Sequence, residues 1–279
     1  MLGADGWKAI AEVNPPELPD MSHLLLDNVW RHVLITDNVF GRIRLSPYAY
    51  AARITHDVPS VNPTVVVSTR DRNILAIESE VRGALGNGVR SFLVVVGDTM
   101  PRVEHMAHHY EIVEHLWELR EHLPRFEVGM PTRFREWQFR RRIDVGAQYF
   151  VAGPVLDPAT IAPNMERLRL TADDPPVYCM VVPPFSPAWV ERNVDIGAEP
   201  ITPALQKRLA ACPKEGRREL GWQVSLEAAE AARDAGCSGV VLMGLRFRTV
   251  VDEAAGVWRP ASGVSTDRET GGQSHHHHP

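Results

Sequence analysis

The chain is poor in cysteine and has no long apolar run. Its three cysteines, Cys179, Cys212 and Cys237, are odd in number and share no spacing typical of a metal site. No apolar run reaches the roughly 18 residues that a membrane span needs. The first residues, "MLGADGWKAIAEV", lack a basic stretch followed by an apolar core. We therefore expect reduced thiols, no membrane partner and a cytoplasmic location.

An excess of positive charge is also missing. Thirty Lys and Arg residues against 35 Asp and Glu residues give a net charge of −5, which argues against a nucleic-acid partner. No long exposed apolar helix is evident in the pattern. We therefore expect no obligate protein partner.

Several catalytic motifs are absent as well. The glycines of "GALGNG", residues 83–88, have the wrong spacing for a dinucleotide fingerprint, and they follow a helical pattern rather than a strand. There is no G-x-S-x-G elbow, and no cluster of His and Cys follows the predicted strands. We expect neither covalent serine catalysis nor a metal site.

What is present is one long domain and a polar tail. Residues 263–279, "GVSTDRETGGQSHHHHP", have no apolar period and end in a His tract, so we expect them to be disordered. Residues 1–262 alternate between short apolar runs and amphipathic segments. The predicted strands, each flanked by Gly, Pro or charge, are Lys8–Val13, His32–Thr36, Thr64–Thr69, Ser91–Val96, Phe126–Val128, Tyr149–Ala152, Val177–Val182 and Gly239–Met243.

Helical patterns separate these strands. They cover Leu18–Arg31, Pro47–Thr55, Asp71–Leu85, Pro101–Leu123, Arg133–Val145, Pro158–Leu168, Ala188–Val194 and Gly216–Ala235, with a short extra helix at Pro200–Leu209 before the last long one. Such alternation over about 250 residues is typical of a closed parallel barrel. We predict an α/β fold, a single (β/α)8 TIM barrel with a short extra helix before the last barrel helix.

Catalytic groups of this fold lie at the carboxyl ends of the strands. Asp98, which follows the buried run "FLVVV", would then face the barrel mouth, although a helix N-cap explains its position equally well. The same rule brings Glu12 to the mouth from the first strand. Carboxylates, arginines and aromatic rings without a metal suit proton transfer beside a flat polar heterocycle.

At this point the chain resembles the methylenetetrahydrofolate reductase family, whose catalytic domain is a (β/α)8 barrel. The segments that carry the resemblance are "AEVNPPE" for an E-x-x-P-P first strand, "VLITDN", "STRDRNILAIESEVRGALGNGVRSFLVVVGDTMP" with its strand ending in G-D-x-P, "RRIDVGAQYFV" and "EPITPALQKRL". The third is the most specific, because many of its positions agree in order. The resemblance covers residues 10–250.

The resemblance implies an NAD(P)H-dependent oxidoreductase that reduces 5,10-methylenetetrahydrofolate to 5-methyltetrahydrofolate. By motif match Glu12 is the general acid that opens the five-membered ring of the folate, and Asp98 holds the pterin. A cap or an ion pair remains the structural alternative for Glu12. The expected partner is therefore a small molecule, a reduced folate.

Further contacts with substrate or cofactor are expected around the mouth. Arg142 is assigned to the dinucleotide pyrophosphate by resemblance, although a basic residue near a helix C-terminus also complements the helix dipole. Phe185, or its neighbour Trp189, would offer a stacking surface for a flat ring. The remaining candidates follow the ends of other strands: Thr36, Asn38, Thr69, Gly97, Met130 and Arg246.

The chain departs from the family where flavin is held. In place of an aromatic, a His, a Tyr and a second His it has Asp37, Val66, Met130 and Phe134. The family's folate-binding Gln of the sixth strand is also missing, because Ala152-Gly153 in "FVAGPVLD" takes the place of its T-Q. Four lost contacts at about 1 kcal/mol each would weaken FAD by several orders of magnitude. We therefore expect direct hydride transfer from NADH, with NADPH left open and without bound FAD.

Two alternatives stay open. Since so many site positions have changed, the chain could be a non-catalytic or accessory folate-binding relative. It could also be a barrel enzyme that retains FAD and acts on another C–N bond.

Overall fold

The computed structural model describes residues 1–3, 6–98 and 104–262. Its strands form one closed parallel barrel in chain order, in which β8 also pairs with β1. They are β1 (Lys8–Val13), β2 (His32–Ile35), β3 (Asn62–Ser68), β4 (Ser91–Val95), β5 (Glu127–Thr132), β6 (Phe150–Val155), β7 (Val177–Val181) and β8 (Gly239–Leu242). The predicted TIM barrel is confirmed.

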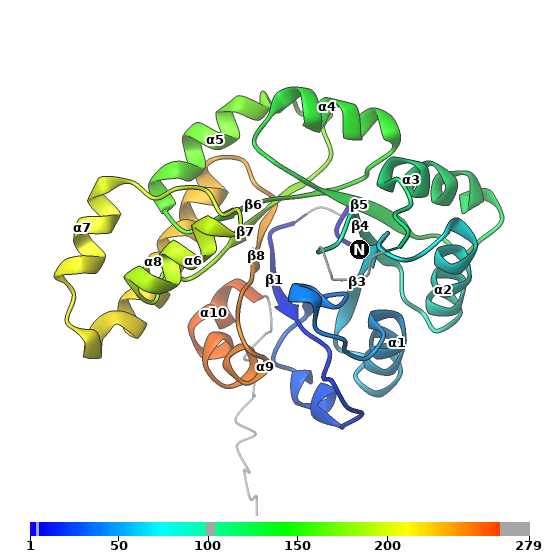
Figure 1. The fold of residues 1–279 in the computed structure, drawn as a ribbon, viewed down its shortest axis with the longest axis horizontal. Helices are drawn as coiled ribbons and strands as arrows, with labels where there is room; N and C mark the ends of the chain where they lie inside the picture. Colours follow the sequence, from blue (N-terminus) through cyan, green and yellow to red (C-terminus); the bar gives the residue numbers. More distant parts are fainter. Residues whose placement is uncertain (4–5, 99–103, 263–279) are drawn as a thin grey trace, which may run out of the picture.

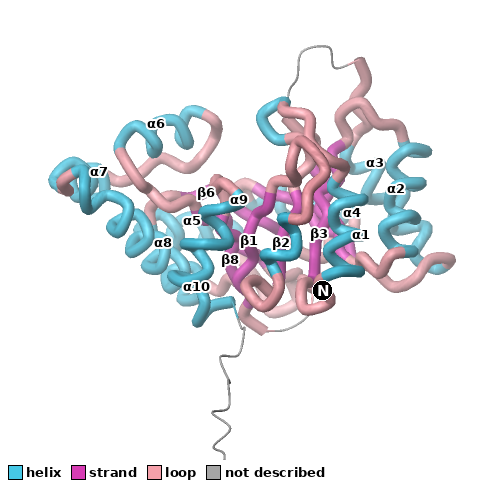
Figure 2. Tube along the Cα trace, turned by 90° about the horizontal axis from the view of Figure 1, so that it is seen from below, coloured by secondary structure: helices cyan, strands magenta, loops and turns pink. Residues whose placement is uncertain are grey.

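Helices surround the strands (Figure 1). They are α1 (Pro47–Asp57), α2 (Ile74–Gly86), α3 (His109–Glu118), α4 (Glu136–Val145), α5 (Ile161–Leu168), α6 (Pro187–Asp195), α7 (Pro203–Ala211), α8 (Arg217–Asp234), α9 (Phe247–Thr249) and α10 (Ala255–Ser262). The predicted extra helix is α7, which lies with α6 at one side of the barrel (Figures 1 and 2). Within the described residues, no helix combines the length and apolar character that crossing a membrane requires.

Alternation along the strands divides the core into two layers. On β1, Ala9, Ala11 and Val13 belong to the large outer layer beneath the helices, whereas Ile10 belongs to the small cluster inside the barrel. Glu12 shares the inward parity of Ile10 and lies one step nearer the mouth. At the opposite end Leu2 joins the inner cluster, and the backbone N–H of Gly3 donates to Glu127 Oε2 at 2.7 Å.

Two predicted helices are corrected. Residues 18–31 contain only a 3-10 turn at Ser22–Leu26, because the chain reverses at Asn28, whose φ is +56°. The helix predicted from Pro101 begins at His109 instead. Residues 104–108 are not helical and include an isolated antiparallel bridge between Arg70 and Met106, and Pro101 itself lies outside the described residues.

Two predicted strands were cut short at Gly and Pro. β5 and β6 run on to Thr132 and Val155. Pro131 lies beyond the last β4 pairing, and Pro154 lies where the register with β7 shifts, so neither removes a needed ladder hydrogen bond. The sequence pattern predicts no helix after β8. The chain there forms α9, a π-helical turn and α10, whose Trp258 is fully buried.

Candidate functional site

A cavity of about 490 Å³ opens at the carboxyl ends of the strands. Its floor is apolar and consists of inward side chains from successive strands: Leu34, Val66, Leu93, Val151 and Met180. Its polar rim is made by strand ends, the loops that follow them and helix α4: Glu12, Thr36, Asp37, Asp98, Arg133, Gln138 and Arg142. We call this the mouth cavity.

Glu12 reaches the mouth cavity from β1. Its Oε1 accepts a hydrogen bond from the backbone N–H of Gly244 at 3.3 Å. Burial raises the pKa of Glu12 to about 7, the Gly244 hydrogen bond opposes this shift, and the negative charge of Asp98 adds to it. A carboxyl group with this pKa holds or releases a proton near neutral pH, as a general acid must.

Asp98 lies in the loop after β4 and lines the same cavity. Its Oδ2 accepts a hydrogen bond from the backbone N–H of Phe40 at 2.6 Å, and its own carbonyl accepts one from Arg70. The preceding Gly97 has a φ of +91°, and a side chain there would overlap the Ser68 hydroxyl. The sharp turn at Gly97 thus directs Asp98 towards the loop that follows β2.

Asp37 is a second buried carboxylate at the mouth. It is 4% exposed and forms an ion pair with Arg72, which offsets the cost of burying its charge. Beside it, the Thr36 hydroxyl donates to Asn14 Oδ1 at 2.7 Å. The predicted contact Thr36 therefore does line the cavity, but its hydroxyl proton is already donated to Asn14.

Gln138 was not among the predicted site residues. It extends from the first turn of α4 into the mouth cavity, and its Oε1 accepts a hydrogen bond from the Arg133 backbone N–H at 2.8 Å. Among the described residues its amide NH2 has no partner. The helix carries no strand-end signal at this position, so sequence reasoning missed it.

Arg142 also reaches the mouth cavity from α4. Its guanidinium donates to the carbonyl of Pro131, and its Nε lies 3.4 Å from the Tyr110 hydroxyl. Part of the charge is therefore held by the protein rather than offered to a ligand.

Four predicted contacts lie elsewhere. Met130 is fully buried in the outer layer, because β5 continues past it and strand parity turns Gly129 and Pro131 inward instead. The Thr69 hydroxyl is buried against the Val96 carbonyl at 3.4 Å. Neither residue lines the cavity.

Asn38 and Phe185 are structural as well. The backbone N–H of Arg44 donates to Asn38 Oδ1 at 2.8 Å, which fixes the loop after β2. Phe185 packs edge-on against Trp222 with ring centroids 5.1 Å apart, and Gly221 leaves room for its ring. Trp189, the alternative stacking surface, is the one that faces a cavity.

That second cavity adjoins the mouth. It has a volume of about 790 Å³ and is formed by the loops after β1, β2 and β8 together with α6. Glu12 lines both cavities, and the predicted contact Arg246 lies in the second. We call it the arginine groove, after five of its lining residues: Arg42, Arg44, Arg192, Arg246 and Arg248.

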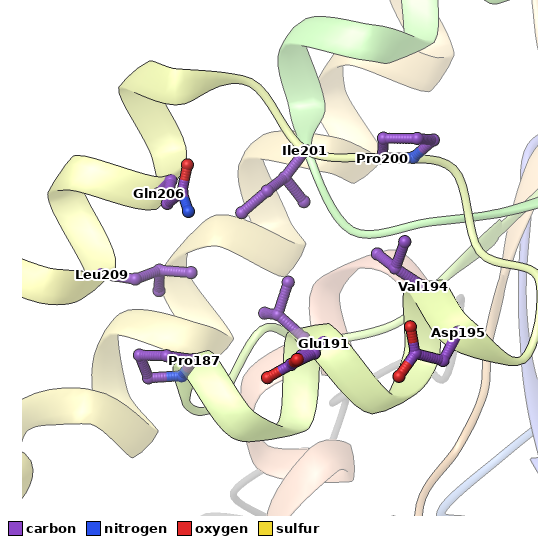
Figure 3. Close-up of a pocket in the computed structure, with 9 residues that line it drawn as sticks. Pro187, Glu191, Val194, Asp195, Pro200, Ile201, Gln206 and Leu209 are labelled. Carbon is purple, nitrogen blue, oxygen red and sulfur yellow. The ribbon is translucent and has the colours of Figure 1, made fainter.

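A third hollow lies away from the mouth, between α6 and α7 (Figure 3). Its walls mix apolar residues such as Val194 and Leu209 with the carboxylates of Glu191 and Asp195. It contains none of the predicted site residues. Across residues 1–3, 6–98 and 104–262, no group of three or more His, Cys, Asp or Glu side chains is placed to hold a metal ion.

Comparison with known proteins supports the fold alone. No family model and no curated protein matches the chain. A solved structure described as 2,3-dimethylmalate lyase, a member of the PEP mutase/isocitrate lyase superfamily, is 14% identical, with a TM-score of 0.53 over 92% of this chain and 81% of that one. Another, described as a native KDPGal structure, is 13% identical, with a TM-score of 0.49 over 92% and 98%.

Proposed function

We propose that the chain reduces 5,10-methylenetetrahydrofolate to 5-methyltetrahydrofolate with NADH as the hydride donor. The observation that carries the proposal is the pairing of Glu12 and Asp98 in one cavity with an apolar floor. One carboxyl group there has a pKa near 7 and the other accepts hydrogen bonds, the two functions that a pterin substrate needs.

Glu12 supplies the proton for ring opening. The protonated carboxyl group of Glu12 donates its proton to N10 of the folate. The bond between the methylene carbon and N10 then breaks, and the electron pair of that bond stays on N10. The methylene carbon remains on N5 as an iminium ion. Bound NADH, when present, supplies the hydride that converts this carbon to a methyl group and leaves as NAD⁺. Glu12 then regains its proton from solvent, which balances the reaction.

The other residues of the mouth cavity orient the substrate. Asp98 accepts hydrogen bonds from the amino and ring N–H groups of the pterin. The free amide NH2 of Gln138 donates a hydrogen bond to an acceptor of the pterin. Gln138 therefore replaces the folate-binding glutamine that the sixth strand lacks. The apolar floor of Val66, Leu93 and Val151 supports the flat ring and keeps water from the iminium.

The residues at the expected flavin positions do not fit a flavin. Asp37 is committed to Arg72, and Val66 presents only an apolar side chain to the cavity. Met130 and Phe134 are buried in the outer layer. None of the four offers a free hydrogen-bonding or stacking group, so the proposal includes no flavin step.

The experiment is to mix purified protein with NADH and methylenetetrahydrofolate and follow the nicotinamide absorbance while methyltetrahydrofolate is quantified. We expect equal loss of NADH and gain of product by protein without a flavin absorption band. Quenching of tryptophan fluorescence by folate without turnover would favour the folate-binding alternative. A flavin band at unit occupancy would favour the FAD-retaining one.

A further inference from the structure

The arginine groove is richer in positive charge than the rest of the chain would suggest. Five arginines line it, in a protein whose formal net charge is −5. They come from three separate segments of the chain: the loop after β2, helix α6 and the segment after β8. A concentration of one charge in a concave site marks an anion-binding surface.

Most of this charge is not neutralised by the protein. Arg42 is paired with Glu17 at 2.5 Å, and Arg248 lies 3.8 Å from Asp252. By contrast, among the described residues Arg246 has no hydrogen-bond or ion-pair partner. Within the part of the chain that the structure describes, Arg192 contacts only the ring of Trp189, 5.7 Å from its guanidinium carbon.

Arg44 completes the unpaired set. Its Nη1 donates to the carbonyl of Pro15 at 3.0 Å, but its Nε is buried and has no hydrogen-bond partner in residues 1–3, 6–98 and 104–262. Leaving a buried charged donor unsatisfied is costly unless a ligand completes it. Among the described residues, no ion pair joins a carboxylate of the groove to these three arginines. Glu17 is bound to Arg42, Asp20 accepts from the backbone and side chain of Ser22, and Glu12 accepts from the backbone N–H of Gly244.

We infer that the arginine groove binds the pyrophosphate of the nicotinamide dinucleotide while the folate occupies the mouth cavity. Guanidinium groups suit phosphate because they donate two parallel hydrogen bonds. Trp189 and the 71% exposed Phe40 are aromatic surfaces in the same groove on which an adenine ring can stack. Glu12 lines both cavities, so the two ligands meet at the general acid. This inference rests on the proposed function.

The tail of a folate is the competing source of negative charge, because its glutamate carboxylates also suit arginine. The larger volume and the aromatic walls of the groove favour the dinucleotide. The groove also replaces the predicted pyrophosphate contact Arg142, whose guanidinium is engaged by Pro131.

The test measures binding rather than turnover. Dissociation constants of NADH, inorganic pyrophosphate and mono- and triglutamyl tetrahydrofolate are measured for wild type, Arg192→Ala, Arg246→Ala and the exposed control Arg167→Ala in α5. We expect the two groove variants to bind NADH and pyrophosphate at least tenfold more weakly, with unchanged melting temperature and unchanged affinity for the monoglutamate. The control should match wild type.

Two results would overturn the inference. In one, NADH and pyrophosphate bind the groove variants as tightly as wild type. In the other, the variants lose affinity only for triglutamyl tetrahydrofolate, which would mean that the groove binds the glutamate tail of the folate. The proposed function has a separate failure: tenfold weaker NADH binding in the variants, together with a wild type that forms no methyltetrahydrofolate, would uphold the groove and reject the reductase.

Discussion

At the scale of single residues, the account depends on the proton of Glu12. We expect Glu12→Gln to lower kcat by about 10²–10⁴-fold, the usual contribution of a general acid, because the amide has the same shape but no acidic proton. The matched control is Glu114→Gln on the exposed side of α3, which should keep wild-type kcat. Steady-state rates at pH 6.5 decide this, and a Glu12→Gln variant with normal turnover would remove Glu12 from the mechanism.

The raised pKa of Glu12 also sets the direction of the pH dependence. The active form is protonated, so kcat/KM should fall as pH rises through about 7, tenfold per unit at higher pH. A pH-rate profile from pH 5.5 to 9 measures this. A rate that instead rises through pH 7 would mean that the group acts as a base.

The same shift predicts an effect on stability. Because the folded state raises the pKa of Glu12 from 4.5 to about 7, the folded protein binds this proton more tightly than the unfolded chain does. Stability is therefore lost as pH rises from 4.5 to 7. Glu12→Gln should be more stable than wild type by about 3 kcal/mol at pH 8 and equal to it at pH 4. Urea unfolding at both values tests this, and equal gains at both would contradict it.

Residue chemistry explains which site positions could be predicted. Glu12 and Asp98 follow from the rule that catalytic groups lie near strand ends, because Glu12 is the last residue but one of β1 and Asp98 comes three residues after β4. Met130 could not be placed in this way, because the direction of its side chain depends on where β5 ends. The glycine and proline of "VGMPT" indicate an early end, whereas β5 continues to Thr132. Gln138 is invisible to the same rule because a helix, not a strand end, delivers it.

At the scale of elements, the turn between β4 and Asp98 is the most constrained part of the site. Gly97→Ala should destabilise the protein by about 1–3 kcal/mol, since a Cβ would both strain a φ of +91° and overlap Ser68. It should also raise KM for the folate by displacing Asp98. Gly83→Ala is the control: Gly83 lies inside α2 with open space around it, so alanine there should be neutral or mildly stabilising.

A second link ties the extra helix to the barrel. Asp157 is 3% exposed, and its Oδ2 accepts hydrogen bonds from the backbone N–H and the hydroxyl of Thr202 at 2.7 and 2.6 Å, at the start of α7. Asp157→Ala should cost about 2–4 kcal/mol because it leaves several donors unpaired. Asp173→Ala, at an exposed position, should cost little. Equal unfolding midpoints for the two variants would mean that Asp157 does not hold α7.

Elements were predicted best where strand and loop chemistry agree. β1 was predicted to the residue, because charge and proline bound it on both sides. The non-helical residues 104–108 were missed, because the polar, His-rich pattern there continues into α3 without a break. They are held apart from the helix by the bridge from Met106 to Arg70 and by Asp71, whose carboxylate accepts from the backbone N–H groups of Glu104 and His105.

At the scale of the whole molecule, two cavities that share Glu12 let both ligands bind at once. Initial rates measured against both substrates should therefore give intersecting double-reciprocal lines, the pattern of a ternary complex. Parallel lines would show that the donor leaves before the folate arrives, as a relay through a bound carrier requires. The groove itself could not be predicted from the sequence, because its arginines, which follow β2, β7 and β8, are brought together only when the barrel closes.

The most direct test of direct hydride transfer is the fate of an isotopic label. The enzyme would be supplied with NADH carrying deuterium at both C4 positions, in ordinary water. The number of deuterium atoms in the methyl group of the product would then be determined by mass spectrometry. The account predicts one deuterium in every new methyl group. Methyl groups that contain only protium, formed at the full rate, would show that the hydride had passed through a site that exchanges with water, and the account would be wrong.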